Sequence, residues 1–165
     1  FLGGTMVSAA TTRIGPITIA KKNFLRIQVI VAGYGASDIA ALRFNGSGAS
    51  NYVDRHISWA QGGTTAAQTA TLTTGMIRLA GVAITGGRSI ECFVTNRVGS
   101  LKTVAITTQN ETNLGTVATA PLLGFGGGMW SNTASQIDQI ELVTQSGNTL
   151  IAGSGFIVHG NDQTG

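Results

Sequence analysis

The stretch of sequence that best indicates the fold is Leu42-Arg43-Phe44-Asn45-Gly46-Ser47-Gly48-Ala49-Ser50-Asn51-Tyr52. Asn45-Gly46 is a turn signal, and the small polar residues after it are typical of a loop between two β-segments. Leu42, Phe44 and Tyr52 are spaced so that their side chains can pack together. The stretch therefore predicts two strands joined by a loop, and nothing in it is typical of a catalytic site.

Strand-like segments recur on both sides of this stretch. In residues 24–31 the apolar Leu25, Ile27, Val29 and Val31 alternate with Arg26, Gln28 and Ile30, which predicts a strand with one buried face. We expect residues 38–44 to run back antiparallel to that strand. In residues 88–95 both alternating sets contain apolar side chains, so we expect both faces to be covered. Further strands are expected at residues 14–20, 52–59, 70–79, 101–108, 122–130, 137–144 and 150–159.

About nine short strands, separated by turns rich in the 24 glycines, define the fold class. No window shows the 3.6-residue periodicity of a helix. We therefore predict an all-β protein, an antiparallel β-sandwich of the jelly-roll type. Residues 13–160 form the sandwich domain, residues 1–12 an extended N-terminal arm with little to bury, and residues 161–165 a polar tail.

The low fraction of charged residues indicates what kind of partner this chain contacts. Only 10% of the residues are charged and 42% are hydrophobic, whereas soluble domains carry about 25% charged residues. We expect neighbouring subunits to cover much of the surface. The longest apolar run contains Arg26 and is shorter than the roughly 20 residues of a spanning helix, so we expect no membrane insertion. The net charge of +3 is scattered, which argues against specific nucleic-acid binding.

Motifs for catalysis or cofactor binding are missing from the sequence. It has no Gly-x-Ser-x-Gly, no phosphate loop and no His-Glu-x-x-His, so we expect no catalytic residues, no cofactor and no metal site. Asp54, His56 and Ser58 share one face of a strand, but they run in a line, which suits a solvated face better than a triad. The single Cys92 is expected to be a small buried residue. The glycines of residues 124–128 predict a kinked strand or a bulge rather than a phosphate cradle.

Aromatic side chains offer one alternative function. Trp59, Trp130 and Tyr52, together with Tyr34, are the residues on which a sugar ring could stack. Packing in the core or at a subunit interface is the interpretation we favour for them.

Three blocks of the sequence resemble a group of tailed-phage and prophage structural proteins. The first block is Leu42–Tyr52, where those proteins have LRFNGD followed by NY. The second is Gly127-Gly128-Met129-Trp130-Ser131-Asn132-Thr133-Ala134 with Ile137, Ile140 and Leu142, and the third runs from Gly147-Asn148 to Ile151-Ala152-Gly153-Ser154-Gly155-Phe156-Ile157-Val158-His159-Gly160. Ser47 stands where the family usually has Asp, which puts in doubt any role of that Asp. The resemblance implies a virion component without enzymatic activity, in the head or the tail.

The leading hypothesis is a capsid decoration or cement protein on the exterior of a phage particle. We expect a homotrimer that contacts itself and other virion proteins such as the major capsid protein. The expected assembly contacts are Leu2, Met6, Val7, Lys21 and Lys22. The alternative is a tail or fibre module that binds host-surface glycan through Trp59, Trp130 or Tyr52.

Overall fold

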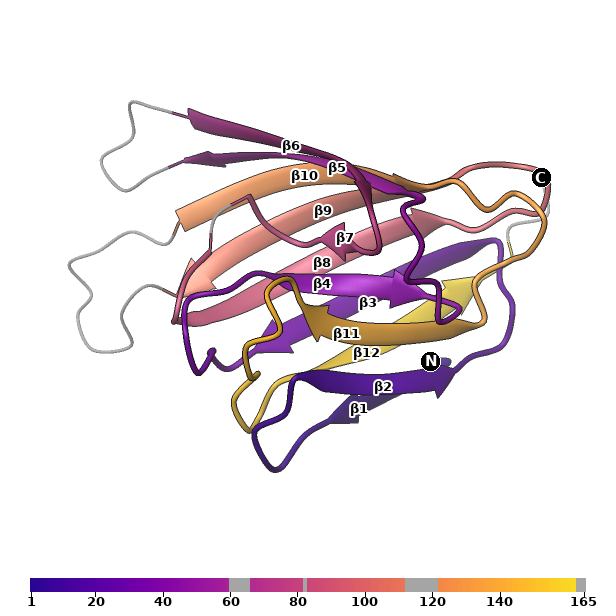
Figure 1. Ribbon diagram of the computed structural model, residues 1–165. Coiled ribbons are helices and arrows are strands. Elements are labelled where there is room, and N and C mark those ends of the chain that lie inside the picture. The colour runs from indigo at the N-terminus through magenta and orange to yellow at the C-terminus, as the bar shows by residue number, and fades with distance from the viewer. Residues whose placement is uncertain (60–65, 82, 112–121, 163–165) are drawn as a thin grey trace.

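The computed structural model describes residues 1–59, 66–81, 83–111 and 122–162, and for residues 58, 59, 66–74, 110, 111 and 122 it describes the backbone alone. The described residues contain strands and turns but no helix (Figure 1).

Two antiparallel sheets pack face to face. The large sheet contains, in spatial order, β1 (Gly3–Met6), β12 (Gly155–Asn161), β3 (Phe24–Val31), β8 (Gly87–Thr95), β9 (Lys102–Glu111), β10 (Leu122–Trp130), β5 (Tyr52–Trp59) and β6 (Ala66–Thr74). The small sheet contains β2 (Arg13–Thr18), β11 (Gln139–Thr144), β4 (Ala40–Phe44) and β7 (Ile77–Arg78). In Figure 1 the small sheet lies in front of the large one. The predicted all-β sandwich is confirmed.

The core lies between the two sheets and follows from the alternation of each strand. Leu25, Ile27, Val29 and Val31 of β3 are at most 2% exposed, as the period of two predicts. Leu42 and Phe44 of β4 face them from the small sheet and are fully buried. Removing such side chains from water contributes roughly 25 cal/mol per Å² of apolar area to folding.

The described residues form twelve strands, where about nine were expected. One added strand is β1, and another arises because the segment expected as one strand at residues 70–79 is divided between the two sheets. Gly75 lies at that division, where an added Cβ would be 2.6 Å from the carbonyl oxygen of Gly48. The close approach of two backbones ends β6 and allows β7 to begin in the other layer.

The pairing expected for residues 38–44 is wrong. β4 pairs with β11 and β7 of the small sheet and not with β3. The chain crosses from one layer to the other at most of its connections. The run β8–β9–β10 is different, because these three consecutive strands remain neighbours within the large sheet.

The N-terminal segment, expected to be an extended arm, is partly a strand of the domain itself. β1 pairs with β12 at the edge of the large sheet, and Leu2 and Val7 pack against the core. Glycine makes this possible, since a Cβ on Gly155 would lie 2.2 Å from the carbonyl oxygen of Thr5. At the other end of the chain, Asp162 of the expected tail accepts hydrogen bonds from Lys22 and from the backbone of Asn23.

The stretch Leu42–Tyr52 forms the corner at which the chain passes from the small sheet to the large one. The Tyr52 hydroxyl is hydrogen-bonded to both the backbone N and O of Phe44, at 3.0 and 3.1 Å. Asn45 has a φ of 51°, and its side-chain oxygen accepts hydrogen bonds from the backbone N–H groups of Asp138 and Gln139. The first sequence block therefore meets the second here, through the hydrogen bonds of Asn45 to the backbone between Ile137 and Ile140.

Candidate functional site

A buried polar cluster joins the two sheets at β5 and β7. Asp54 accepts hydrogen bonds from Arg78 Nη2 at 2.6 Å, from Arg78 Nε at 2.9 Å and from the Arg78 backbone N–H at 3.1 Å. His56 Nε2 lies 3.4 Å from Asp54 Oδ1, and the side chains of all three residues are at most 7% exposed. The prediction that Asp54 and His56 lie on a solvated face is wrong, because both point into the sandwich.

The chemistry of this cluster is that of a buried ion pair. Burial opposes ionisation of Asp54, but the interaction with nearby His56 and the hydrogen bonds from Arg78 lower the pKa of its carboxyl group below the usual value. The side chain of Ser58, the third member of the imagined triad, lies outside the described residues. The Asp54 carboxylate is thus paired with Arg78, and this ion pair connects β5 to β7. Figure 1 shows where β5 and β7 lie in the two sheets.

The glycines of β10 make room for side chains of neighbouring strands. A Cβ on Gly126 would lie 2.2 Å from His56 Nδ1, and a Cβ on Gly128 would lie 3.1 Å from Ile77 Cγ2. The bulge given as one of the two expectations for these glycines is not present, because β10 pairs with β9 and β5 in continuous register. The glycine-rich segment is therefore a regular strand over which His56 and Ile77 pack.

Three of the aromatic residues considered for glycan stacking are core residues. Trp130 is 1% exposed and lies stacked on Tyr52, with ring centroids 5.9 Å apart and an interplanar angle of 12°. Tyr52 is fully buried and Tyr34 is 3% exposed. Trp130 and Tyr52 therefore cannot present a stacking surface to a sugar, which corrects that assignment. The side chain of Trp59 lies outside the described residues.

Four of the five residues expected to make assembly contacts are engaged within their own domain. Leu2 and Val7 pack against the core, Lys21 lies 3.3 Å from Asp138, and Lys22 lies 2.6 Å from Asp162. Met6 remains half exposed. These intrachain contacts leave room for contacts with a neighbouring subunit. Of the five residues, Met6 lies on the apolar surface described next.

The side of the large sheet that faces away from the small sheet carries most of the exposed large hydrophobic side chains of the described residues. We call it the outer face. Of eleven exposed large hydrophobic side chains, seven lie on it, and each is 37% to 51% exposed. They are Met6, Ile30, Phe93, Leu123, Phe125, Met129 and Ile157. The expectation that both faces of residues 88–95 are covered does not hold within one chain, because Phe93 is half exposed.

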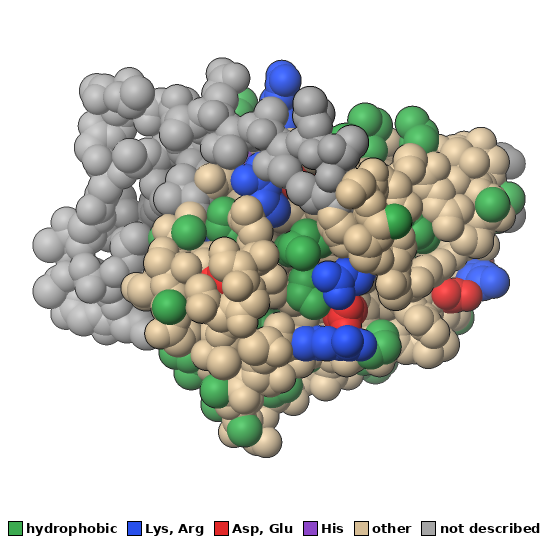
Figure 2. Space-filling view, in the orientation of Figure 1, with side chains coloured by type: hydrophobic (Ala, Val, Ile, Leu, Met, Phe, Trp, Pro, Cys, Tyr) green, Lys and Arg blue, Asp and Glu red, His purple; other side chains and the backbone are tan. Residues whose placement is uncertain are grey.

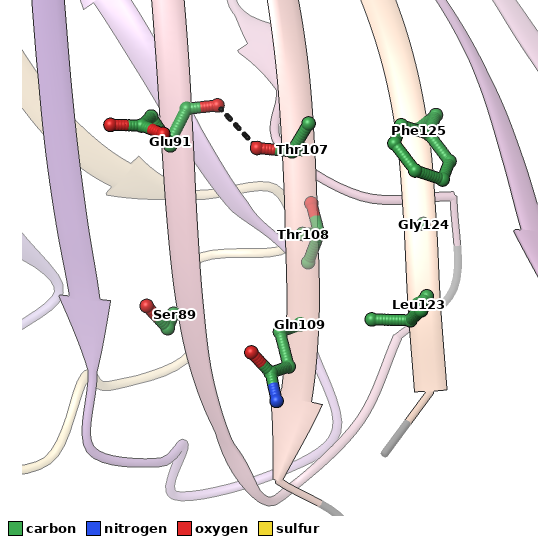
Figure 3. Close-up of a pocket in the computed structure, with 8 residues that line it drawn as sticks. All are labelled: Ser89, Glu91, Thr107, Thr108, Gln109, Leu123, Gly124 and Phe125. Atoms are coloured by element: carbon green, nitrogen blue, oxygen red, sulfur yellow. Dashed lines mark hydrogen bonds between the residues drawn. The ribbon is translucent and has the colours of Figure 1, made fainter.

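The strand register arranges the outer face as a grid of cross-strand rows. One row comprises Ile157, Gln28, Glu91, Thr107, Phe125 and Ile57. Three shallow depressions lie among these rows, and one of them shares Ser89 and Glu91 with the second and Arg26 with the third. Figure 3 shows one of about 260 Å³, over β8, β9 and β10, in which the Thr107 hydroxyl donates to the Glu91 backbone oxygen.

Charge on the outer face is sparse and partly neutralised. Arg26 of β3 forms an ion pair with Glu91 of β8, and the two side chains are 49% and 31% exposed. Arg55 of β5 is also exposed. The middle of the face therefore presents no extended field of one sign.

The small sheet presents a different surface. Figure 2 shows basic and acidic side chains gathered near the middle of that side. Glu141 of β11 is 3% exposed and forms ion pairs with Arg13 of β2 and, at 3.2 Å, with Arg43 of β4. Charge thus gathers on the small sheet and apolar side chains on the large one.

Cys92 is fully buried, as predicted, and burial raises the pKa of its thiol. Among the described residues, no group of three or more His, Cys, Asp or Glu side chains could hold a metal ion. Within that same part of the chain, no helix has the length and apolar character needed to cross a membrane.

No protein-family model matches the chain, and no curated protein sequence matches it. Two solved structures are distantly similar. SCP-B, a member of the eqolisin family of peptidases in complex with the tripeptide Ala-Ile-His, is 14% identical, with 93% of this chain and 77% of that chain covered and a TM-score of 0.23. Scytalido-glutamic peptidase with a peptide-based transition state analogue is 13% identical, with 93% and 78% covered and a TM-score of 0.22. Scores this low carry no argument about function.

Proposed function

We propose that this chain is a non-enzymatic structural subunit of a phage virion. It is a decoration or cement protein on the exterior of the head that associates with copies of itself and with the major capsid protein. The sequence blocks that resemble tailed-phage structural proteins give the biological setting. The outer face gives the physical means of association.

The observation that carries the proposal is the presence of seven exposed large hydrophobic side chains on one face of one sheet. Monomeric soluble proteins rarely expose contiguous apolar patches larger than a few hundred Å². A six-strand region is held rigid by continuous backbone pairing from β12 to β5. Such a surface gains free energy when a neighbour covers it, at roughly 25 cal/mol per Å² before the entropic cost of association.

The resemblance blocks support a role in folding for the residues they contain. Tyr52 and Asn45 of the first block hold the corner between the sheets, and Trp130 of the second block stacks on Tyr52. Proteins of the group that contain the same residues would form the same corner, and therefore the same arrangement of the two sheets. Ser47, which replaces the family's usual Asp, lies 3.4 Å from Asn51 Oδ1 through its hydroxyl, within the loop after the corner.

The alternative, a tail or fibre module that binds glycan, has lost most of its basis. It requires exposed aromatic rings, and Trp130 and Tyr52 are buried. We therefore keep the head decoration protein as the proposed function.

Electron microscopy of purified particles with a labelled antibody against this chain tests the proposal. Label distributed over the head supports it. Label confined to the tail would favour the alternative, and particles without label would contradict a virion role.

A further inference from the structure

We propose that the outer face of the large sheet binds the outer face of a second copy of this chain. This inference rests on the proposed function, because it names the partner of the surface through which the subunit is proposed to assemble. The arrangement is an isologous pair with two-fold symmetry, in which two sandwiches stack through their large sheets.

The first argument is the available area. The six strands from β12 to β5 are separated by five spacings of about 4.8 Å, and eight residues of strand extend about 27 Å, which gives about 650 Å² per copy. Two copies would bury about 1,300 Å², within the range of about 1,200–2,000 Å² that is typical of specific, stable interfaces. The face is large enough for a stable pair without any contribution from the loops.

The second argument is the amino-acid composition of the outer face. Outward positions near the centre are occupied by Phe93, Phe125, small or polar uncharged side chains such as Ala105 and Thr107, and one charged residue, Glu91, which pairs with Arg26. Cores of protein interfaces are depleted in charged residues and enriched in aromatic residues and methionine. Arg26 and Glu91 keep each other as counter-ions when two copies approach, and the apolar contacts of the face must exceed the cost of removing this ion pair from water.

The third argument is shape. Two sheets pack face to face with their strands within about 30° of each other, an angle set by the twist of each sheet. An identical sheet has the same twist, so a second copy satisfies this condition without adjustment. The shallow depressions on the face leave space for protruding side chains of the facing sheet.

The pair would leave the small sheets on the two outer sides of the stack. The ion-paired cluster around Glu141 would then be presented to other components of the particle. A two-fold pair also implies a dimer or an even number of copies, in place of the homotrimer expected from the resemblance.

Sedimentation velocity of the purified chain over a concentration series tests the pair. The variant is Phe93→Glu with Phe125→Glu, which places two carboxylates on each of the facing surfaces. Its matched control is Val98→Glu with Leu101→Glu, which adds the same charge at exposed apolar positions between β8 and β9. Circular dichroism and thermal melting verify that each variant is folded.

We expect a wild-type dimer, an unchanged dimer for the control, and association at least about 100-fold weaker for the face variant. A mixture of the glutamate variant with Phe93→Lys and Phe125→Lys protein should form mixed dimers, because opposite charges then face each other. A wild-type monomer or trimer, or a face variant that dimerises as well as its control, would overturn the inference. These results are independent of antibody labelling on particles, so failure of the pair is distinguishable from failure of the virion role.

Discussion

The hydroxyl group of Tyr52 holds the backbone of Phe44 across the corner between the two sheets. It accepts a hydrogen bond from the Phe44 N–H at 3.0 Å and donates one to the Phe44 carbonyl oxygen at 3.1 Å. Both residues are fully buried, so neither backbone group can turn to water instead. One side chain on the large sheet thus fixes where the last residue of β4 lies.

Replacing Tyr52 with Phe should destabilise the protein by about 1–3 kcal/mol, because the ring stays in place while the buried Phe44 N–H loses its partner and the Phe44 carbonyl oxygen keeps only the Ser47 N–H. Chemical denaturation gives the free energy of unfolding. Thr107→Val is the control, since its hydroxyl makes an exposed hydrogen bond of 3.5 Å, and its effect should stay within about 0.5 kcal/mol. Equal stabilities of the wild type and Tyr52→Phe would show that the corner does not depend on these hydrogen bonds.

Asp54 makes the stability of the sandwich sensitive to acid. The pKa of its carboxyl group is lowered in the folded protein, so the ion pair with Arg78 contributes fully above the unfolded value of about 3.9. That contribution is lost as the pH falls through the folded pKa. Replacing Asp54 with Asn leaves Arg78 buried without its counter-ion and should cost about 3–5 kcal/mol at pH 7.

Unfolding measured between pH 7 and pH 2 should show the wild type and Asp54→Asn converging in stability as the pH drops. Asp162 is the comparison carboxylate, because the pKa of this exposed group is also lowered, chiefly by its hydrogen bond from Lys22. Asp162→Asn should change the profile little. A constant difference between wild type and Asp54→Asn across the whole range would contradict the buried ion pair.

Two neighbouring glycines of β10 should respond differently to alanine. A Cβ on Gly126 would lie 2.2 Å from His56 Nδ1, whereas a Cβ on Gly127 would meet only the Val104 carbonyl oxygen, at 3.4 Å. Gly126→Ala should therefore destabilise by about 1–3 kcal/mol through overpacking, while Gly127→Ala should be tolerated.

The double variant Gly126→Ala with His56→Ala isolates the cause. Removing the imidazole should restore part of the stability lost by Gly126→Ala, as a coupling energy in a double-mutant cycle. Thermal melting of the four proteins provides the values. Strictly additive effects would mean that His56 and Gly126 do not share space.

Deleting residues 1–12 should do more than weaken attachment to a particle. The deletion removes β1 from the edge of β12 and uncovers core atoms beneath Leu2 and Val7, at a cost on the order of 2 kcal/mol. Gly155→Ala tests the same contact without shortening the chain, because its Cβ would meet the backbone of Thr5. Hydrogen exchange should then increase first in β12 of both variants and in β1 of Gly155→Ala, and unchanged protection of β12 in both variants would contradict the docking of this segment.

The strands were predictable because their signal is local. The alternation in β3 gave both the strand and its buried face, since a period of two places every second side chain on one side. The partners were not predictable from the same signal. Whether β4 pairs with β3 or with β11 depends on residues about 100 positions away, so the expected neighbour was wrong.

Glycine explains the missed strand β1. Gly3, Gly4 and Gly155 carry no apolar signal in the sequence, yet their lack of a side chain is what lets β1 approach β12. A strand made of such residues is visible only when its partner is known.

The polar side chains of Asp54 and His56 led to a wrong prediction. Polar residues on one face of a strand indicate that the face is solvated, but here Arg78, 24 residues from Asp54, supplies the positive charge that pairs with the buried carboxylate. The outer face was partly predictable, because the alternation of residues 88–95 already placed Phe93 opposite the buried Cys92. Identifying the residues of other strands that lie beside Phe93 on the outer face requires the register of six strands.

The most direct test of the virion assignment is the amount of this chain per particle. Quantitative mass spectrometry of purified particles should give a fixed ratio of this chain to the major capsid protein, corresponding to copies on the order of hundreds, as expected for a subunit that covers a symmetric shell. Absence from purified particles, or a trace that varies between preparations, would contradict the account.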